Sequence, residues 1–494
     1  MSHGKEIAKN AAWLMVAQTA QKALSFLTFL VVARLVGVEV TGRFFYAVSV
    51  TSVFVTLSDL GLTPVLIRQM AQEEEKGKAL LRTVFKGKAL LIPLAVMASL
   101  GYGWMVGLSG ETWLSVGLAC LVLSADAVSL TWYGAIRGRR LLQYEAVGMF
   151  VGQVLTACAS LLSAWMFGWG APGLVVGLLT GSSWNMVWSA WQAKTMGLWP
   201  AKDASAPRLL DVVRLAWPFA LAGMFVKVYS YVDTLLLREY HTETEIGYYA
   251  LAYKITYAFQ FLPLAFVAAL YPGMSAAYAS KEKDALRKIL MGSLRLMTIV
   301  AAPLAAVLSA YADRFIPFMY GPEFFGAIAP LQILPWVLLP IFWDFPLGSL
   351  LNATHRAEKK TVAMGIAMVL NVCANSLLVP RFGPVGAAWS ALGSFWALFL
   401  VSAWFVRKDL LPGLEASSLF LRGALAAGIT WGLIRIATPP MPFIAGAIFC
   451  GAASLAVLFA TRLLLMEDVK MVLRWIRVKA GTPDPVDEKL HSRR

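Results

Sequence analysis

Apolar stretches long enough to cross a lipid bilayer fill almost the whole chain, and only short polar segments separate them. A transmembrane helix needs about 20 mostly apolar residues, and we expect about fourteen such helices. Their approximate ranges are 11–36, 43–67, 81–106, 112–136, 145–168, 172–194, 212–237, 247–273, 289–311, 326–350, 361–380, 384–406, 416–437 and 442–465. The pattern predicts an all-α membrane protein without a separate soluble domain.

Lysine and arginine gather on one side of this predicted bundle. If the N-terminus is cytoplasmic, most of the 43 basic residues fall in cytoplasmic segments, as the positive-inside rule requires. We therefore expect an even number of spans with both termini in the cytoplasm. Lys5 and Lys9 precede the first span, which we interpret as a retained helix because it is too long for a signal peptide.

Composition agrees with the membrane assignment, since 59% of the 494 residues are hydrophobic and 14% are charged. The net charge of +15 follows from the basic segments. Their dispersion over many short segments argues against nucleic-acid binding. All four cysteines lie inside predicted spans, which favours packing roles over a disulfide or metal set. They are Cys120, Cys158, Cys373 and Cys450.

The chain contains an internal repeat. "VLTACASLL" (154–162) is echoed by "VLNVCANSLL" (369–378), and a glycine-rich turn follows each copy. At the start of the two halves, Lys22 corresponds to Lys227, and Gly42 corresponds to Gly247. An even number of spans in each copy implies two lobes related by an axis along the membrane normal, with a site between them near the midplane.

The repeat predicts two six-helix lobes and two additional helices. We divide the chain into an N-lobe (1–205), a C-lobe (206–410), two C-terminal spans (411–466) and a cytoplasmic tail (467–494). The tail begins as an amphipathic helix with basic residues around an apolar face, a pattern typical of a helix on an anionic membrane surface.

Several polar side chains lie within the predicted spans, where a charge is costly unless it faces a cavity or a partner. A stripe on the first span contains Gln18, Gln21 and Lys22, and the seventh span carries Lys227 and Tyr231 at a matching place. Lys254 lies in the eighth span. These six residues are our candidate substrate-cavity residues. The lysines suit an anionic group such as a phosphate, although a structural ion pair with Asp233 would also explain Lys227.

Four acids form a second set of candidates. Asp59, Asp126, Asp233 and Asp344 all fall within or beside predicted spans. Each carboxylate is a candidate for coupling to a proton or a sodium ion, or for an ion pair that fixes helix packing. The tenth span also carries several prolines, which predict a broken helix. These prolines are Pro330, Pro335, Pro340 and Pro346.

The sequence shows no signature of an enzyme. The four histidines are scattered over loops and termini, and no P-loop sequence occurs. A membrane glycosyltransferase or oligosaccharide ligase would be expected to carry an acid or histidine cluster in a sizeable outside loop. The longest candidate loop, 311–327, has one arginine and two acids. We expect no catalytic residues, no metal and no cofactor other than a coupling ion.

Several segments together resemble the oligosaccharide flippases of the polysaccharide transporter family, within the multidrug/oligosaccharidyl-lipid/polysaccharide exporter superfamily. The resemblance spans roughly residues 8 to 410. Its clearest segments are "ARLVGVEVTGRFFYAVSV" (33–50), "SDLGLTPVLIRQMA" (58–71), "YVDTLLLREYHTETEIGYYALAYKI" (231–255), "IPFMYGPEFFGAIAPLQIL" (316–334) and "LLNATHRAEKKT" (350–361).

The resemblance implies a fourteen-helix, two-lobed transporter that works by alternating access. Its expected cargo is an undecaprenyl-pyrophosphate-linked oligosaccharide, moved to the outer leaflet of a bacterial inner membrane for O-antigen, capsule or exopolysaccharide synthesis. A polysaccharide polymerase and chain-length proteins are then candidate partners. Two alternatives remain on the same scaffold, namely a multidrug exporter and a lipid II flippase. Matched lysines argue against the exporter, whose cargo is cationic.

Overall fold

The structure is a computed structural model that describes residues 2–200, 207–407 and 413–468, without the side chains of 2–18, 268–269 and 413–414. Within these ranges the chain is helical and has no strand. The first half contains α1 (Ser2–Phe54), α2 (Leu62–Gln72), α3 (Glu74–Met105), α4 (Gly110–Gly138), α5 (Leu142–Leu162) and α6 (Gly170–Thr195). The second half contains α7 (Leu209–Tyr240), α8 (Glu243–Tyr257), α9 (Phe261–Ala279), α10 (Lys283–Ala310), α11 (Ala312–Met319), α12 (Ile328–Ile333), α13 (Leu338–Ala353), α14 (Ala357–Val406), α15 (Gly413–Ala437) and α16 (Phe443–Ala460).

Two glycines interrupt the longest helices. Gly37 in α1 has φ 81° and Gly383 in α14 has φ 53°, a left-handed backbone that glycine adopts without a Cβ clash. Each long helix is therefore two helical segments. By length and composition, 11 helices of the described chain could cross a membrane. Dividing α1 and α14 at these glycines and adding α6 would give the fourteen spans, a number that stays a prediction.

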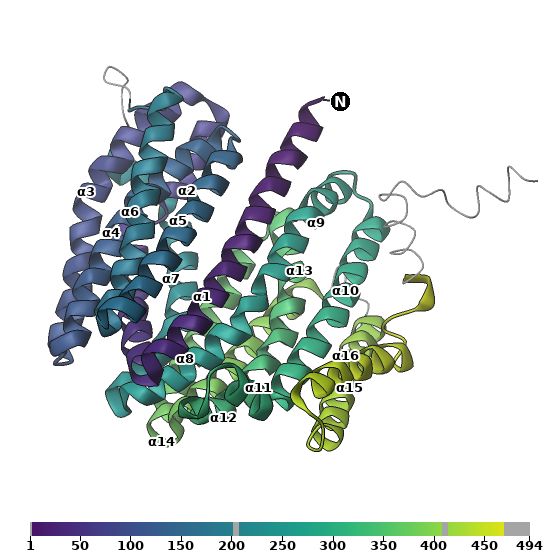
Figure 1. The fold of residues 1–494 in the computed structure, drawn as a ribbon. Helices are drawn as coiled ribbons and strands as arrows, with labels where there is room; N and C mark the ends of the chain where they lie inside the picture. Colours follow the sequence, from purple (N-terminus) through teal and green to yellow (C-terminus); the bar gives the residue numbers. More distant parts are fainter. Residues whose placement is uncertain (1, 201–206, 408–412, 469–494) are drawn as a thin grey trace, which may run out of the picture.

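The helices form two groups that meet at one end and diverge at the other (Figure 1). The N-lobe group consists of α2 to α6, the C-lobe group consists of α8 to α14, and α1 and α7 run between them. Helices α15 and α16 pack beside α10 on the far side of the C-lobe. We call the end near Gly37 and the start of α8 the closed end, and the end near the N-terminus the open end.

The seventh helix belongs to both groups. Its first turns place Val212 and Ala216 in the apolar core formed by α2, α3 and α4, while Leu237 near its end lies in the C-lobe core. Helix α8 then begins at Thr242, whose hydroxyl accepts a hydrogen bond from the Glu245 backbone N–H at 3.3 Å in a capping box. This cap fixes the turn between α7 and α8 at the closed end.

The prolines of the predicted tenth span break it as expected. Residues 322–353 fold as a 3-10 helix, the short helix α12, a second 3-10 turn that contains Pro335, and then α13. The ring nitrogen of proline has no hydrogen to donate, and Pro335 lies where the α-helix is interrupted, whereas Pro346 is accommodated inside α13. Apart from residues 467 and 468, the predicted amphipathic tail lies outside the described part of the chain.

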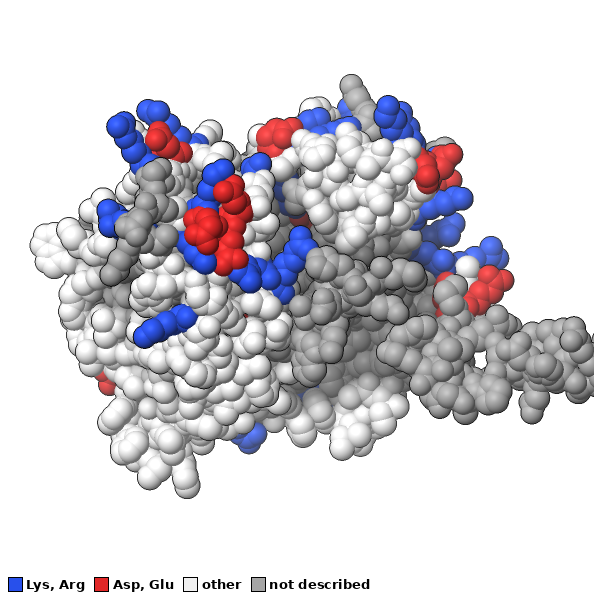
Figure 2. Space-filling view, turned by 90° about the horizontal axis from the view of Figure 1, so that it is seen from above, with Lys and Arg blue, Asp and Glu red and all other residues white. Residues whose placement is uncertain are grey.

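The surface agrees with a membrane environment. Large apolar side chains are exposed along the helices, and exposed tryptophans lie near both ends, as in the aromatic belts of membrane proteins. Viewed from the open end, lysine and arginine side chains gather over the upper part and the right side of the face, together with aspartate and glutamate (Figure 2). Exposed basic residues at the helix ends on this side include Lys76, Arg139, Arg140, Lys281, Lys283 and Lys288.

Candidate functional site

Where the lobes adjoin, a lysine of one helix lies near lysines of two other helices. Lys22 lies on α1, Lys227 on α7 and Lys254 on α8. Lys22 is close enough to each of the other two for their positive charges to interact. The Lys227 Nζ lies 5.5 Å from the ring centroid of Tyr231. The Lys254 Nζ lies 5.5 Å from that of Phe29. An anion bound among these amines would reduce their mutual repulsion.

The aspartate that faces this lysine cluster is Asp126 on α4. Its carboxylate interacts with the charge of Lys227 and accepts a hydrogen bond from Ser182. Asp126 and Gln21 both line a pocket of about 360 Å³ inside the N-lobe. With three lysines and one aspartate, the junction keeps an excess of positive charge. It therefore suits an anionic group better than a cationic one.

The N-lobe pocket is lined by polar side chains. Tyr133 donates a hydrogen bond to Asn185 Oδ1 at 2.7 Å, which holds the two side chains on its wall. A smaller pocket of about 80 Å³ shares Gln153 and Thr156 with it and reaches Lys254. A polar surface thus runs from the N-lobe interior to the lysine cluster. Hydroxyl and amide groups of this kind can bind a hydroxylated ligand through hydrogen bonds.

Arg137 and Glu145 form an ion pair on the wall of the N-lobe pocket. The Arg137 Nε donates to Glu145 Oε2 at 2.7 Å, and a second guanidinium nitrogen donates to the other oxygen. Glu145 is buried. The sequence analysis did not single out this pair. The signal was present, because an arginine near the end of one span and a glutamate at the start of the next can meet across a tight turn.

The predicted acid Asp59 forms an ion pair and a backbone hydrogen bond within the N-lobe. Its Oδ1 lies 2.8 Å from the Nζ of Lys88, which is buried on α3 and also donates to the Ala127 carbonyl at 2.9 Å. The other oxygen accepts from the Thr63 backbone N–H at 3.3 Å, near the start of α2. The sequence analysis did not single out Lys88, although a lysine inside the predicted span 81–106 indicates a buried partner.

The other two acids face the C-lobe. Asp233 is buried and accepts hydrogen bonds from the Tyr249 hydroxyl and, at 2.7 Å, from the Thr234 N–H, so it ties α7 to α8. Asp344 on α13 forms an ion pair with Lys360 on α14 and lines a separate pocket. Neither acid pairs with Lys227. Gln18 lies in the part of α1 whose side chains the structure does not describe.

At the closed end, an ionic network joins α1 and α4 to α8. Arg43 on α1 bonds Glu243 on α8, and it also lies 3.0 Å from Glu111 of α4. The Thr112 hydroxyl donates to Glu243 at 2.8 Å. Helices α1 and α8 approach so closely here that a Cβ added at Gly42 would lie 1.8 Å from the Glu243 carbonyl oxygen. The lobes are therefore locked together at this end.

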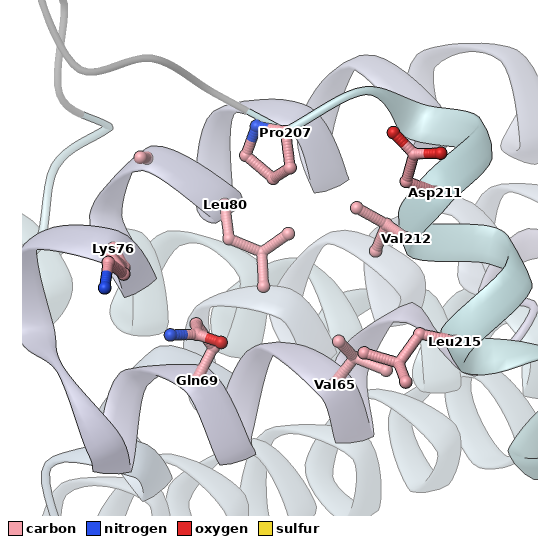
Figure 3. A pocket seen from close by; sticks show the side chains of 9 residues that line it. Val65, Gln69, Lys76, Leu80, Pro207, Asp211, Val212 and Leu215 are labelled. Carbon is pink, nitrogen blue, oxygen red and sulfur yellow. The ribbon is translucent and has the colours of Figure 1, made fainter.

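A further pocket of about 430 Å³ lies at the open end, between α2, α3 and the start of α7 (Figure 3). Val65, Leu80 and Val212 are among the apolar residues of its wall, and Gln69 and Asp211 are among the polar ones. It is far from the lysine cluster along α7, so we do not include it in the candidate site.

Comparisons with known proteins identify the family. Residues 7–278 match the family described as "Polysaccharide biosynthesis protein". The chain belongs to this family. Residues 218–377 also match the MatE family, which overlaps with the second half of the fold. Together the two matches agree with the resemblance to oligosaccharide flippases of the larger exporter superfamily.

Two curated relatives come from Haloferax volcanii. One is named a probable low-salt glycan biosynthesis flippase, Agl15, and is 21% identical over 79% of this chain and 81% of its own length. The other is named a probable flippase, AglR, and is 23% identical over 78% of this chain and 80% of its own length.

Solved structures share the fold. The lipid II flippase MurJ in an inward closed conformation superimposes with a TM-score of 0.71 at 15% identity, over 92% of this chain and 99% of MurJ. An inward-facing multidrug resistance transporter of the MATE family gives 0.63 at 15% identity, over 81% of this chain and 95% of the transporter. The predicted two-lobed helical membrane fold is thereby confirmed.

Proposed function

We propose that this protein is a flippase that carries a lipid-linked glycan across the membrane by alternating access. The observation that carries the proposal is the cluster of Lys22, Lys227 and Lys254, placed at the junction of the lobes beside a polar pocket. Lysine amines are suited to a phosphate group. The flippase names of its relatives support the same class of cargo.

In finer terms, we propose undecaprenyl pyrophosphate as the carrier and the inner membrane of a bacterium as the location. The basic residues at the helix ends of the open end support a cytoplasmic orientation for that end. In this orientation the observed conformation would accept cargo from the cytoplasmic leaflet. Release on the other side would require the closed end to separate. Synthesis of an O-antigen, capsule or exopolysaccharide would use such a cargo, and a polymerase with chain-length proteins would act downstream.

A multidrug exporter is the alternative that the shared fold allows. The excess of positive charge at the lobe junction favours an anionic cargo over an organic cation. We propose no enzymatic step. Coupling to a proton or sodium ion remains part of the proposal, and Asp126 is its best candidate because it is the acid that interacts with the lysine cluster.

The test uses the full chain in liposomes with fluorescent undecaprenyl-pyrophosphate tetrasaccharide, whose exchange between leaflets is followed with a membrane-impermeant quencher. Lys227→Ala should lower the exchange rate about ten-fold or more, the loss expected for one charged hydrogen bond. Lys194→Ala is the matched control, since Lys194 is exposed near the end of α6.

Equal rates for the wild type, Lys227→Ala and Lys22→Ala would contradict the cavity assignment. Ethidium is run as a second cargo in the same liposomes. If ethidium moves and the lipid does not, the protein is a multidrug exporter and the proposal fails.

A further inference from the structure

A second pocket, with a few polar groups on a mainly apolar wall, lies inside the C-lobe, on the other side of α7 and α8 from the lysine cluster. Its volume is about 700 Å³, and its walls come from α7, α8, α9, α13 and α14. This volume falls within the range of small-molecule sites, about 300–1,000 Å³. Neither the lysine cluster nor the pocket of the N-lobe accounts for it.

Two buried polar atoms in this pocket lack a partner among the described residues. They are Asp344 Oδ1 and Ser349 Oγ, five residues apart on α13. Asp344 is 6% exposed and Ser349 is 4% exposed. A buried polar atom without a hydrogen bond is costly, so native structures satisfy almost all of them. Both residues line the pocket, and a small rotation of their side chains would expose the two atoms to the hydroxyl groups of a bound ligand.

The charges of the pocket indicate a neutral ligand. The other oxygen of Asp344 forms an ion pair with Lys360, which balances its charge. The Lys360 amine also lies next to Gly348, where an added Cβ would be 2.8 Å from Nζ. An organic cation would meet this amine in the pocket, whereas a sugar hydroxyl could donate to Asp344 Oδ1 without a charge conflict.

Aromatic rings supply the rest of the surface. Four tyrosines line the pocket, namely Tyr229, Tyr253, Tyr257 and Tyr271. Tyr253 and Tyr257 stack with ring centroids 4.1 Å apart, and Tyr271 is 43% exposed. A tyrosine offers an apolar face and a polar tip. A sugar ring has the complementary form, with C–H groups on one face and hydroxyls around its edge.

We propose that the C-lobe pocket binds neutral sugar residues of the lipid-linked glycan; this inference rests on the proposed function. Helices α7 and α8 connect the two sites. On α7, Lys227 belongs to the lysine cluster while Tyr229 lines the C-lobe pocket. On α8, Lys254 belongs to the lysine cluster and lines the small pocket beside it, while Tyr253 lines the C-lobe pocket. The anionic linker and the sugars would thus occupy opposite sides of the same two helices.

The experiment compares two cargo lipids with the full chain in liposomes. One is fluorescent undecaprenyl pyrophosphate with a neutral hexose tetrasaccharide, and the other is the same lipid without sugar. Ser349→Ala should slow exchange of the glycan lipid about five-fold, the effect of one neutral hydrogen bond, and leave the sugar-free lipid unchanged. Tyr271→Ala should have the same selectivity.

Ser402→Ala is the matched control. The Ser402 hydroxyl is also buried and lacks a partner among the described residues, but it does not line this pocket. It should slow neither lipid. Equal losses for both lipids with Ser349→Ala, no loss for either, or the same selective loss with Ser402→Ala would each overturn the sugar site. So would ethidium transport that depends on Ser349 when glycan transport does not.

Direct binding separates this inference from the proposed function. If wild-type protein moves neither lipid, the flippase proposal fails by itself. Saturation-transfer NMR with the free tetrasaccharide and the protein in nanodiscs then tests the pocket. A sugar signal that Tyr271→Ala removes and Ser402→Ala retains supports the site, and the absence of a signal with wild type overturns it.

Discussion

Replacing Glu243 with glutamine tests whether the ionic network at the closed end holds the lobes together. Glu243 accepts hydrogen bonds from Arg43 of α1 and, at 2.8 Å, from the Thr112 hydroxyl of α4. Both donors lie across the interface from α8. Glutamine has nearly the same size and can still accept from Thr112, so the variant removes the charge and little else.

The exposed fractions of the Arg43 and Glu243 side chains determine how much free energy their ion pair contributes. Arg43 is 26% exposed and Glu243 is 17% exposed, so the pair is neither solvated nor fully buried. Fully exposed pairs contribute about 0–1 kcal/mol, and hydrogen bonds to charged groups contribute about 1.5–3 kcal/mol. We expect about 1–2 kcal/mol here, which shifts the equilibrium about 5- to 30-fold toward conformations with this end apart.

The assay is a distance measurement between spin labels placed at Ser109, just before α4, and at Phe325, in the segment before α12. Both positions are exposed. The exposed native thiols of Cys158 and Cys373 are first replaced by serine. The ratio of long to short distances in the wild type and in Glu243→Gln then gives the shift directly.

Asp313→Asn is the control. Asp313 on α11 pairs with Arg435 of α15 at 2.6 Å, so this variant removes an ion pair within the C-terminal half and none between the lobes. It should leave the distance ratio unchanged. An unchanged ratio in Glu243→Gln, or an equal change in both variants, would show that the ionic network does not hold the closed end.

Two further substitutions follow from buried contacts. Lys88→Met leaves Asp59 without its charged partner, and breaking a buried pair costs about 3–5 kcal/mol. Because the Asp59 side chain is 17% exposed, we expect a smaller loss of stability, measured as a lower melting temperature of the purified protein that Asp59→Asn partly restores. An unchanged melting temperature would contradict this expectation. In Gly247→Ala, the added Cβ would lie 2.1 Å from the Val38 carbonyl oxygen, so the same spin labels should move apart; wild-type distances would contradict this.

The fold was predictable because a bilayer restricts the chain to a few structures. Backbone groups in lipid must bond within their own helix, so apolar length alone locates the spans. The positions where helices begin, end or break were predicted less well. Gly37 and Gly383 each place a single non-helical residue between two neighbouring spans, and the tenth predicted span is interrupted by a 3-10 turn that contains Pro335. The sequence contains the breaks, but their geometry depends on packing.

The candidate site was only partly predictable. Helical periodicity put Gln21 and Lys22 on one stripe; in the structure Gln21 lines the N-lobe pocket, and the charge of Lys22 interacts with that of Lys227. The roles of the acids depended on partners distant in the sequence. Asp59 meets Lys88, and spacing along one helix could not reveal that pair. Hydropathy identifies which polar residues are costly in a membrane, but tertiary contacts decide which of them have partners.

The repeat offers a physical reason for the lysine cluster. Residues at equivalent positions of two copies can meet only near the axis that relates them. Gly42 and Gly247 do so at the closed end, where a Cβ added at Gly42 would lie 2.8 Å from the Gly247 nitrogen. The predicted repeat also pairs Lys22 with Lys227, and their charges interact. In the predicted repeat each copy contributes one lysine, which accounts for two charges that interact between the two halves of the chain.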